Sequence, residues 1–217
     1  VQTDDARSRA LRAEFNRRRE RVGIPGRLSI EQGVVEDKLV NRARWFDLTV
    51  LPLNHPPGDS GLARLGNGFR SLLHRCPRPL LAVPSAPVAF QHALLAYDGS
   101  RKADEALFVA AYLAVEWGIR LTVTGIVGVR GVTTHTLHQA VDYLLEGSVP
   151  HAVVTLGARA DNPASVGSAI THALEISGAD LLIMGSYGKA PLFGLVAGSA
   201  VDEVLRQSEA VPILFCR

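Results

Sequence analysis

The sequence is poor in cysteine, in aromatic residues and in net charge, and these shortages exclude several classes of protein. Two cysteines in 217 residues cannot build the disulfide framework of a small secreted domain, and they favour a reducing compartment. A formal net charge of +2 argues against a dedicated nucleic-acid-binding protein. The longest uncharged run, 79–97, contains three prolines and is therefore no membrane span. The start shows no charged leader followed by an apolar segment, so we expect a cytoplasmic protein.

The hydrophobic content of 47% is enough for a real core, and its pattern indicates the fold class. From residue 92 onward, short apolar segments alternate with stretches of helical periodicity. We expect strands at 92–97, 120–127, 151–156, 180–184 and 211–216, separated by helices at 103–117, 133–146, 162–178 and 198–207. This alternation predicts an α/β fold with an open, five-stranded parallel sheet sandwiched between helices, as in Rossmann-like proteins.

The first part of the chain repeats the end of this pattern. A shift of 133 residues aligns seven identical residues, among them Asp47 with Asp180, Pro79 with Pro212 and Leu81 with Leu214. We therefore expect two repeats, 1–84 and 92–217, joined by a linker at 85–91. In the first repeat we expect the end of a helix at 13–21, strands at 26–31, 47–51 and 79–83, and helices at 33–44 and 66–74.

The two repeats differ in completeness. At this offset Val1 lies opposite Thr134, so the first repeat has no counterpart to its partner's first strand, first helix and second strand. Either this repeat is naturally abbreviated or its beginning is missing. Its final strand, 79–83, pairs with the strand 211–216 within the chain or between chains.

A glycine-rich segment after the fourth strand carries the chemistry. Its glycines follow the spacing Gly-x2-Gly-x9-Gly-Ser, from Gly185 through Gly188 to Gly198 and Ser199. Open parallel sheets bind ligands at the edge where such a segment leaves its strand. Glycines let the backbone approach a phosphate, and a helix beginning at Gly198 offers its N–H groups and dipole. Lys189 adds a cation. The spacing alone also suits a surface loop that ends in a helix cap.

The second repeat resembles a universal stress protein domain of the ATP-binding type. Three features carry the resemblance: the segment 94–100 (Leu-Leu-Ala-Tyr-Asp-Gly-Ser), the glycine-rich segment, and the final strand that begins Val-Pro-Ile-Leu at 211. The family implies a five-stranded fold of the adenine nucleotide alpha hydrolase type, dimerisation through the last strand, and ATP with Mg²⁺ bridging its phosphates. No metal ligands from the protein alone are expected.

The resemblance also implies which residues touch the nucleotide. Asp98 would lie near the ribose and phosphates, and Ile126 would contact adenine through its backbone. Tyr187 stands where the family often has histidine. The full set of expected nucleotide-binding residues is Ala96, Tyr97, Asp98, Gly99, Ser100, Ile126, Met184, Gly185, Tyr187, Gly188, Lys189, Gly198, Ser199 and Ala200.

The first repeat has lost the corresponding residues. Opposite Gly185, Gly188, Gly198 and Ser199 it has Pro52, His55, Leu65 and Gly66. Proline removes an N–H donor, and leucine disfavours a positive φ angle. We therefore expect a pseudo-domain that binds no ATP and pairs with the second repeat as an intrachain pseudo-dimer, with a homodimer as a further arrangement.

Other chemistry-bearing residues have ordinary explanations. His135 and His138 share a helical face but have no nearby carboxylate or cysteine to complete a metal site. We expect Cys76 and Cys216 to be buried thiols, and the arginine-rich segment 7–21 to be a solvated helix. No catalytic residue is identified, because no general base or activated nucleophile accompanies Asp98.

The sequence thus predicts an ATP-binding regulatory protein of the stress response with at most slow hydrolysis. One alternative is a slow ATPase or nucleotidyl-transfer enzyme that uses the same site. Another is the cytoplasmic regulatory domain of a transporter or other larger protein.

Overall fold

The computed structural model describes residues 6–53, 68–86, 88–128, 132–149, 152–157, 166–186, 200–207 and 210–217. The chain divides into two compact units, Val1–Lys38 and Leu39–Arg217. The second unit contains the sheet and the candidate site.

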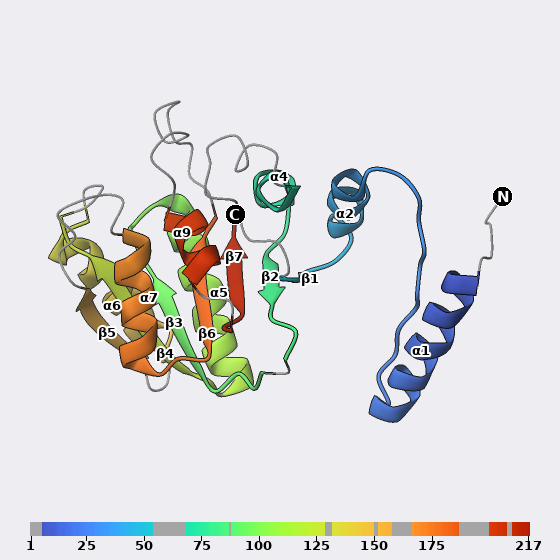
Figure 1. Cartoon of the computed structure of the whole chain (residues 1–217). Coiled ribbons are helices and arrows are strands. Elements are labelled where there is room, and N and C mark those ends of the chain that lie inside the picture. Colours follow the sequence, from blue (N-terminus) through green and yellow to red (C-terminus); the bar gives the residue numbers. More distant parts are fainter. Residues whose placement is uncertain are drawn as a thin grey trace. The chain divides into compact units, whose positions relative to one another are not determined.

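The second unit is built on a seven-stranded sheet with the order β1-β2-β7-β6-β3-β4-β5 (Figure 1). Its strands are β1 (Thr49–Pro52), β2 (Leu80–Val83), β3 (His92–Ala96), β4 (Arg120–Ile126), β5 (Ala152–Gly157), β6 (Leu181–Gly185) and β7 (Ile213–Cys216). The five strands β7, β6, β3, β4 and β5 run parallel to one another. The predicted α/β class is confirmed, and the sheet is larger than the five strands expected for 92–217 because β1 and β2 join it.

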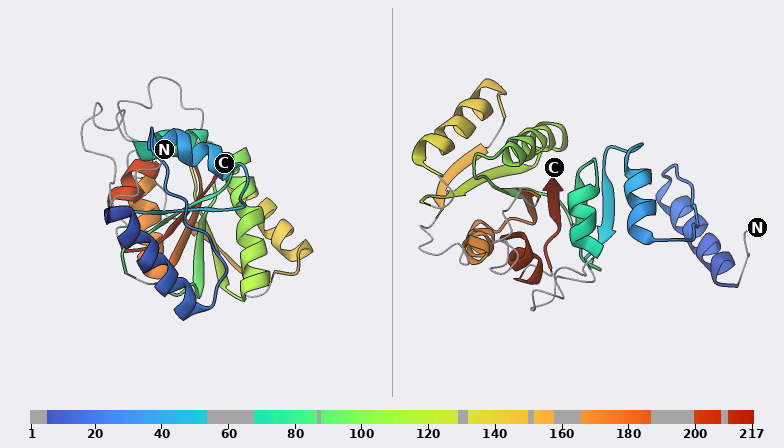
Figure 2. Two further views of the ribbon diagram at one scale, coloured as in Figure 1. Left: turned by 90° about the vertical axis from the view of Figure 1, so that its right-hand side faces the viewer. Right: turned by 90° about the horizontal axis from the view of Figure 1, so that it is seen from above.

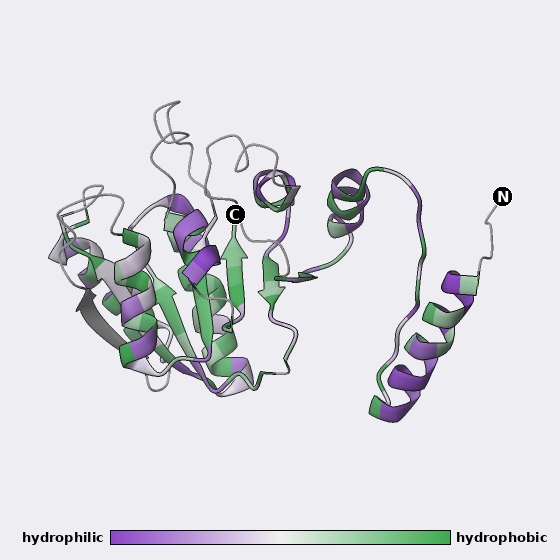
Figure 3. Cartoon of the chain, in the orientation of Figure 1, coloured by the Kyte–Doolittle hydropathy of each residue, from purple (hydrophilic) through white to green (hydrophobic). Residues whose placement is uncertain are grey.

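Helices cover the two faces of this sheet (Figure 2). The helices α5 (Arg101–Trp117) and α6 (Thr134–Glu146) bury one face of the sheet, and Leu95 and Ile183 point into that core. The helices α7 (Val166–Ser177), α9 (Ala200–Gln207), α4 (Gly68–Arg75) and α2 (Val35–Ala43) contribute to the core on the opposite face, with Leu94 and Leu182. Adjacent strand residues thus alternate between the two cores, as the two-residue period of a strand requires. The central strands β6 and β7 are accordingly apolar along their length (Figure 3).

Local sequence signals account for the ends of α5 and α6. Ser100 is the N-cap of α5, and its hydroxyl accepts a hydrogen bond from the Ala103 N–H at 3.3 Å. Gly118 ends this helix in the left-handed conformation, with φ of 66°. Thr133 caps α6 in a reciprocal arrangement with Thr136. The helix expected at 103–117 is confirmed by α5, which begins two residues earlier.

The strands β2 and β7 join the two parts of the sheet. They are antiparallel, with Leu80 opposite Phe215, Leu81 opposite Leu214 and Ala82 opposite Ile213. The final strands therefore pair within the chain, and β7 has a neighbour on each side, β2 and β6.

The strand pair β1–β2 has the same register as the pair β6–β7 at the 133-residue offset. Thr49 lies beside Leu80 in the first pair, and Leu182 lies beside Ile213 in the second. The hydrogen bond from the Thr49 N–H to the Pro79 carbonyl (3.0 Å) corresponds to that from the Leu182 N–H to the Pro212 carbonyl (3.0 Å). The two offset-related residues Leu81 and Leu214 face each other across the antiparallel junction. The two strand pairs are thus related by a local two-fold axis at this position.

The first unit contains α1 (Ala6–Val22) and the segment that follows it. No residue of α1 is buried, and Figure 3 shows its strongly hydrophilic surface. Arg17 and Arg18 form ion pairs with Glu14 and lower the pKa of its carboxyl group, Arg18 having the larger effect. The expected solvated helix is confirmed.

The strand expected at 26–31 is wrong, because the structure has irregular backbone there. Among the described residues, none pairs with this segment as a strand neighbour. Without a neighbouring strand, the backbone N–H and C=O groups hydrogen-bond to water, so the extended conformation gains no stability from a ladder.

Candidate functional site

The candidate site lies where the order of strands in the sheet reverses. The chain proceeds from β3 to β4 and β5 on one side of β3, and then crosses to β6 on the other side. Such a switch point leaves a crevice outside the carboxyl ends of the two strands, which is where open α/β sheets bind ligands. Ala96 and Met184 are paired residues near the ends of β3 and β6. Of the expected residues, Tyr97, Asp98 and Gly185 therefore lie at this switch point.

The turn from β3 into α5 positions the carboxylate of Asp98. Its Oδ1 accepts a hydrogen bond from the Ser100 N–H at 3.0 Å, which fixes the side chain at the first turn of the helix. Gly99 has φ of 70°, and a Cβ atom there would lie 2.5 Å from Cγ2 of Thr136 on α6. Only glycine fits this turn without strain, because both the backbone angle and the neighbouring helix oppose a side chain. Gly99 therefore has a structural reason to be glycine.

Tyr97 is buried beneath this turn and does not face an open crevice. Its side chain is 6% exposed, and its hydroxyl donates a hydrogen bond to Oδ1 of Asp104 at 2.8 Å. Burial raises the pKa of the Tyr97 hydroxyl, and the hydrogen bond to Asp104 raises it further. The pair ties the end of β3 to the first turns of α5, which indicates that the Tyr97 side chain positions the turn.

The end of β6 packs closely against the start of α5. A Cβ atom on Gly185 would lie 3.0 Å from Cβ of Lys102 and 3.2 Å from its backbone carbon. The Lys102 ammonium donates a hydrogen bond to the hydroxyl of the buried Ser186 at 2.9 Å. Burial lowers the pKa of Lys102, and the nearby Arg217 lowers it further. The site thus holds a carboxylate from one strand end and a cation beside the other.

The remaining expected residues fall into two groups. Ile126 is buried at the end of β4, next to the strand that bears Asp98, and Ala200 is the first residue of α9. The glycine-rich segment itself lies outside the described residues, and with it Tyr187, Gly188, Lys189, Gly198 and Ser199.

The structure also bears on the cysteines, on the histidine pair and on membrane-spanning helices. Cys76 and Cys216 are free and buried, as expected. Within the described ranges, no group of three or more histidine, cysteine, aspartate or glutamate side chains could hold a metal ion, His135 and His138 included. Among the same residues, no helix has both the length and the apolarity to cross a membrane.

Comparison with known proteins gives both a sequence relative and structural neighbours. The chain is 27% identical over 190 residues to universal stress protein Slr1230 of Synechocystis, covering 85% of this chain and 63% of that protein's length. The crystal structure of a universal stress protein from Archaeoglobus fulgidus superposes with a TM-score of 0.77 at 21% identity, covering 97% of this chain and 76% of the other. The chain is similar to universal stress proteins in sequence and in fold. No family model matches.

A second structural neighbour supports the same fold over almost the whole chain. A putative universal stress protein from Pseudomonas aeruginosa has a TM-score of 0.64 at 15% identity, covering 99% of this chain and 80% of the other. The chain is thus shorter than these universal stress proteins, and it spans less than two thirds of the Synechocystis relative.

Sequence reasoning from the universal stress protein pattern missed three residues that the structure brings to the site. Lys102 and Ser186 are joined by their hydrogen bond, and Asp104 holds the Tyr97 hydroxyl. Ser186 directly follows Gly185, so its position next to the site could have been read from the strand prediction. The partnership of Lys102 with Ser186 could not, because it links residues 84 positions apart.

Proposed function

We propose that this chain is a nucleotide-dependent regulatory protein of the universal stress protein type, which binds ATP at the switch point between β3 and β6. The observation that carries the proposal is the position of Asp98 and Gly185 at the ends of these adjacent strands. Asp98 supplies a carboxylate for ribose hydroxyls or for the Mg²⁺ that accompanies ATP. Lys102 supplies a cation beside the end of β6.

The residues present suit an adenine nucleotide better than a substrate that needs acid–base catalysis. Asp98 after β3 supplies a carboxylate, and Lys102 and Ser186 beside the end of β6 supply an ammonium and a hydroxyl. Such groups bind ribose and phosphate. No second carboxylate or histidine meets Asp98 in the described hydrogen bonds at this edge, and hydrolysis would need a base to orient water. Binding with slow or no turnover, in the cytoplasm, is therefore the proposed activity.

We further propose that the residues up to 84 form a degenerate repeat that binds no nucleotide. The shared register of β1–β2 and β6–β7 supports this proposal, as does their antiparallel junction at Leu81 and Leu214. Pro52 occupies the position of Gly185 and removes a backbone donor there. The chain then contains an intrachain pseudo-dimer with one working site.

Calorimetric titration of the full chain with ATP and Mg²⁺ tests both proposals. We expect one ATP per chain, with binding lost in Gly188→Val and Gly198→Val and weakened in Asp98→Ala. Gly66→Val is the matched control, because it makes the same glycine-to-valine change in the corresponding segment of the degenerate repeat, opposite Ser199, and should leave binding unchanged. Absence of binding at millimolar ATP would contradict the proposed function, and two ATP per chain would contradict the degenerate repeat. Steady metal-dependent turnover lost in Asp98→Ala would favour an enzyme.

A further inference from the structure

Helix α4, which belongs to the first 84 residues, shares a core with helix α9. Leu73 of α4 and Val204 of α9 are both buried in the apolar cluster on one face of the sheet. Phe69 of α4 also makes an edge-to-face contact with Phe215 of β7, with 6.0 Å between the ring centroids. Helix α4 is therefore packed against the part of the chain that carries the candidate site.

A buried ion pair joins the same two helices. The side chain of Asp202 on α9 is 1% exposed, and that of Arg70 on α4 is 15% exposed. Nη1 of Arg70 lies 3.9 Å from Oδ2 of Asp202. Aspartate is rarely buried to this extent without a partner, because removing a carboxylate from water is costly. The guanidinium of Arg70 thus offsets a negative charge that α9 buries.

The ion pair lies in one electrostatic neighbourhood with the candidate site. His74 follows Arg70 by one turn of α4. Burial lowers the pKa of His74, the positive charges of Arg70 and Lys102 lower it further, and the negative charge of Asp202 raises it. Lys102 in turn donates its hydrogen bond to Ser186 beside the end of β6. Charges on α4 and α9 are therefore near enough to act on a ligand at this edge.

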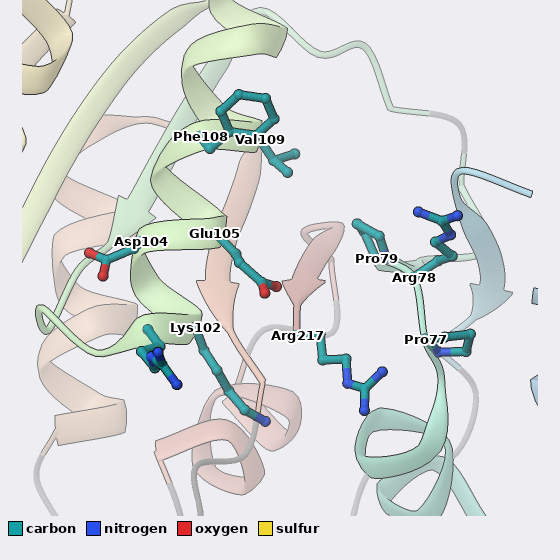
Figure 4. A pocket seen from close by; sticks show the side chains of 10 residues that line it. Pro77, Arg78, Pro79, Lys102, Asp104, Glu105, Phe108, Val109 and Arg217 are labelled. Carbon is teal, nitrogen blue, oxygen red and sulfur yellow. The ribbon is translucent and has the colours of Figure 1, made fainter. Parts of the chain in front are cut away.

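The other charged residues near Lys102 are more strongly screened. Lys102 lines a cavity of about 820 Å³ between α5 and the segment 77–79 that follows α4 (Figure 4). The remaining charged residues of this cavity are all exposed: Arg78, Arg101, Asp104, Glu105 and Arg217. Water and salt screen exposed charges, whereas they screen a buried pair much less. The charges of Arg70 and Asp202 consequently act over a longer distance than those around the cavity.

The carboxylate of Asp202 lies in the first turn of α9. Asp202 is the third residue of this helix, and the helix rises by about 1.5 Å per residue. The next residue, Glu203, is directed toward α7, where the Ser168 hydroxyl donates a hydrogen bond to it. Under the proposed function, phosphates bind at the beginning of α9, where free N–H groups and the helix dipole favour an anion. Asp202 therefore places a second negative charge in the turn that would receive the phosphates.

Two anions in one helical turn repel each other unless a cation compensates for one of them. We propose that Arg70 is a positioning residue for ATP, which neutralises Asp202 and so keeps the beginning of α9 receptive to phosphates. The inference rests on the proposed function and deepens it. The first 84 residues then hold no nucleotide themselves, but they supply a charge on which the nucleotide site depends.

A charge balance and a purely structural tether predict different results. If the ion pair only held α4 against α9, breaking it from either side would weaken ATP binding. If it balances charge, loss of the Arg70 guanidinium should weaken binding, whereas loss of the Asp202 charge should not. In the second case a cation remains beside the phosphates without the competing anion. The two single substitutions therefore separate the two roles.

Calorimetric titration of the full chain and its variants with ATP and Mg²⁺ tests the inference. We expect Arg70→Met to bind ATP at least about tenfold more weakly than the parent chain, because Asp202 then repels the phosphates. Arg70→Lys should keep most of the affinity, since it keeps the charge. Asp202→Asn should bind at least as tightly as the parent chain, and the double variant Arg70→Met/Asp202→Asn should recover to within about threefold of it. Arg75→Met is the matched control, because it removes an exposed guanidinium from the same helix and should leave ATP binding unchanged.

Several outcomes overturn the inference. Unchanged binding in Arg70→Met means that its charge does not matter, and weaker binding in Asp202→Asn means that the pair is a tether only. A double variant as weak as Arg70→Met means that the guanidinium acts on ATP directly. These outcomes leave the proposed function standing, because the parent chain binds ATP in each of them. Absence of binding by the parent chain contradicts the proposed function, and this inference with it. Circular dichroism establishes that the variants are folded, and if Arg70→Met is not, Asp202→Asn and the double variant decide by the same criteria.

Discussion

Replacing Gly99 by alanine tests whether the turn that holds Asp98 is constrained from two directions. The backbone of Gly99 has φ of 70°, and alanine in the left-handed region costs about 1–2 kcal/mol. The new Cβ atom would also lie 2.5 Å from Cγ2 of Thr136, and relieving such an overlap in a packed region costs about 1–3 kcal/mol. We therefore expect Gly99→Ala to lower the free energy of unfolding by about 2–5 kcal/mol.

Gly118 is the matched control for the backbone contribution. Its φ is 66°, and a Cβ atom there would meet nothing within 4 Å. Gly118→Ala should therefore cost only the left-handed strain, about 1–2 kcal/mol. The difference between the two variants measures the clash with α6. Urea unfolding followed by far-ultraviolet circular dichroism gives both values.

Thr136→Ser removes the clashing methyl group and keeps the hydroxyl that caps α6. The Thr136 side chain takes part in the reciprocal cap with Thr133, and serine preserves its oxygen. In the Thr136→Ser background, Gly99→Ala should thus cost little more than Gly118→Ala does. A double-mutant cycle gives this coupling energy directly. Equal costs at Gly99 and Gly118, or no recovery with Thr136→Ser, would refute the reasoning.

Two further predictions concern titrating groups in the sheet. Burial lowers the pKa of His92, so the unfolded chain binds more protons than the folded chain, and stability should fall as the pH drops through about 6.5. In urea unfolding between pH 7.5 and 5.5, His92→Gln should lessen this loss, and an unchanged pH dependence would contradict the assignment. Burial raises the pKa of the Cys216 thiol to about 12, and Cys76 is also buried. Ellman's reagent at pH 8 should label neither thiol until urea unfolds the chain, and fast labelling of the folded chain would contradict the burial.

Periodicity and caps are local signals, and they predicted most of the fold. The helix over 103–117 with its cap at Ser100 needed only the apolar spacing and the flanking glycine, and the structure has α5 at Arg101–Trp117. The strand at 26–31 failed for the opposite reason. A strand depends on a neighbour, and the local sequence cannot tell whether that neighbour exists.

The sequence predicted which strand ends form the candidate site, but it did not predict the side-chain hydrogen bonds there. Asp98 and Gly185 could be assigned to one sheet edge because each follows an apolar strand. Tyr97 was expected beside Asp98 at the nucleotide, and the structure shows that its side chain is buried with the hydroxyl bonded to Asp104. Its orientation is decided by the direction of α5 relative to β3, which is a tertiary property. The Lys102–Ser186 hydrogen bond depends on the same packing.

The surroundings of Pro52 differ from those of Gly185 in a way that agrees with the proposed degenerate repeat. Gly185 must be small because α5 packs against it, with Cβ of Lys102 only 3.0 Å from the position of a Cβ atom. The corresponding residue, Pro52, is exposed at the end of an edge strand whose only paired neighbour is β2. Proline is acceptable on a sheet edge, where its missing N–H breaks no ladder, and it also discourages pairing with a further strand. Because Pro52 is exposed, no close packing among the described residues requires glycine at position 52.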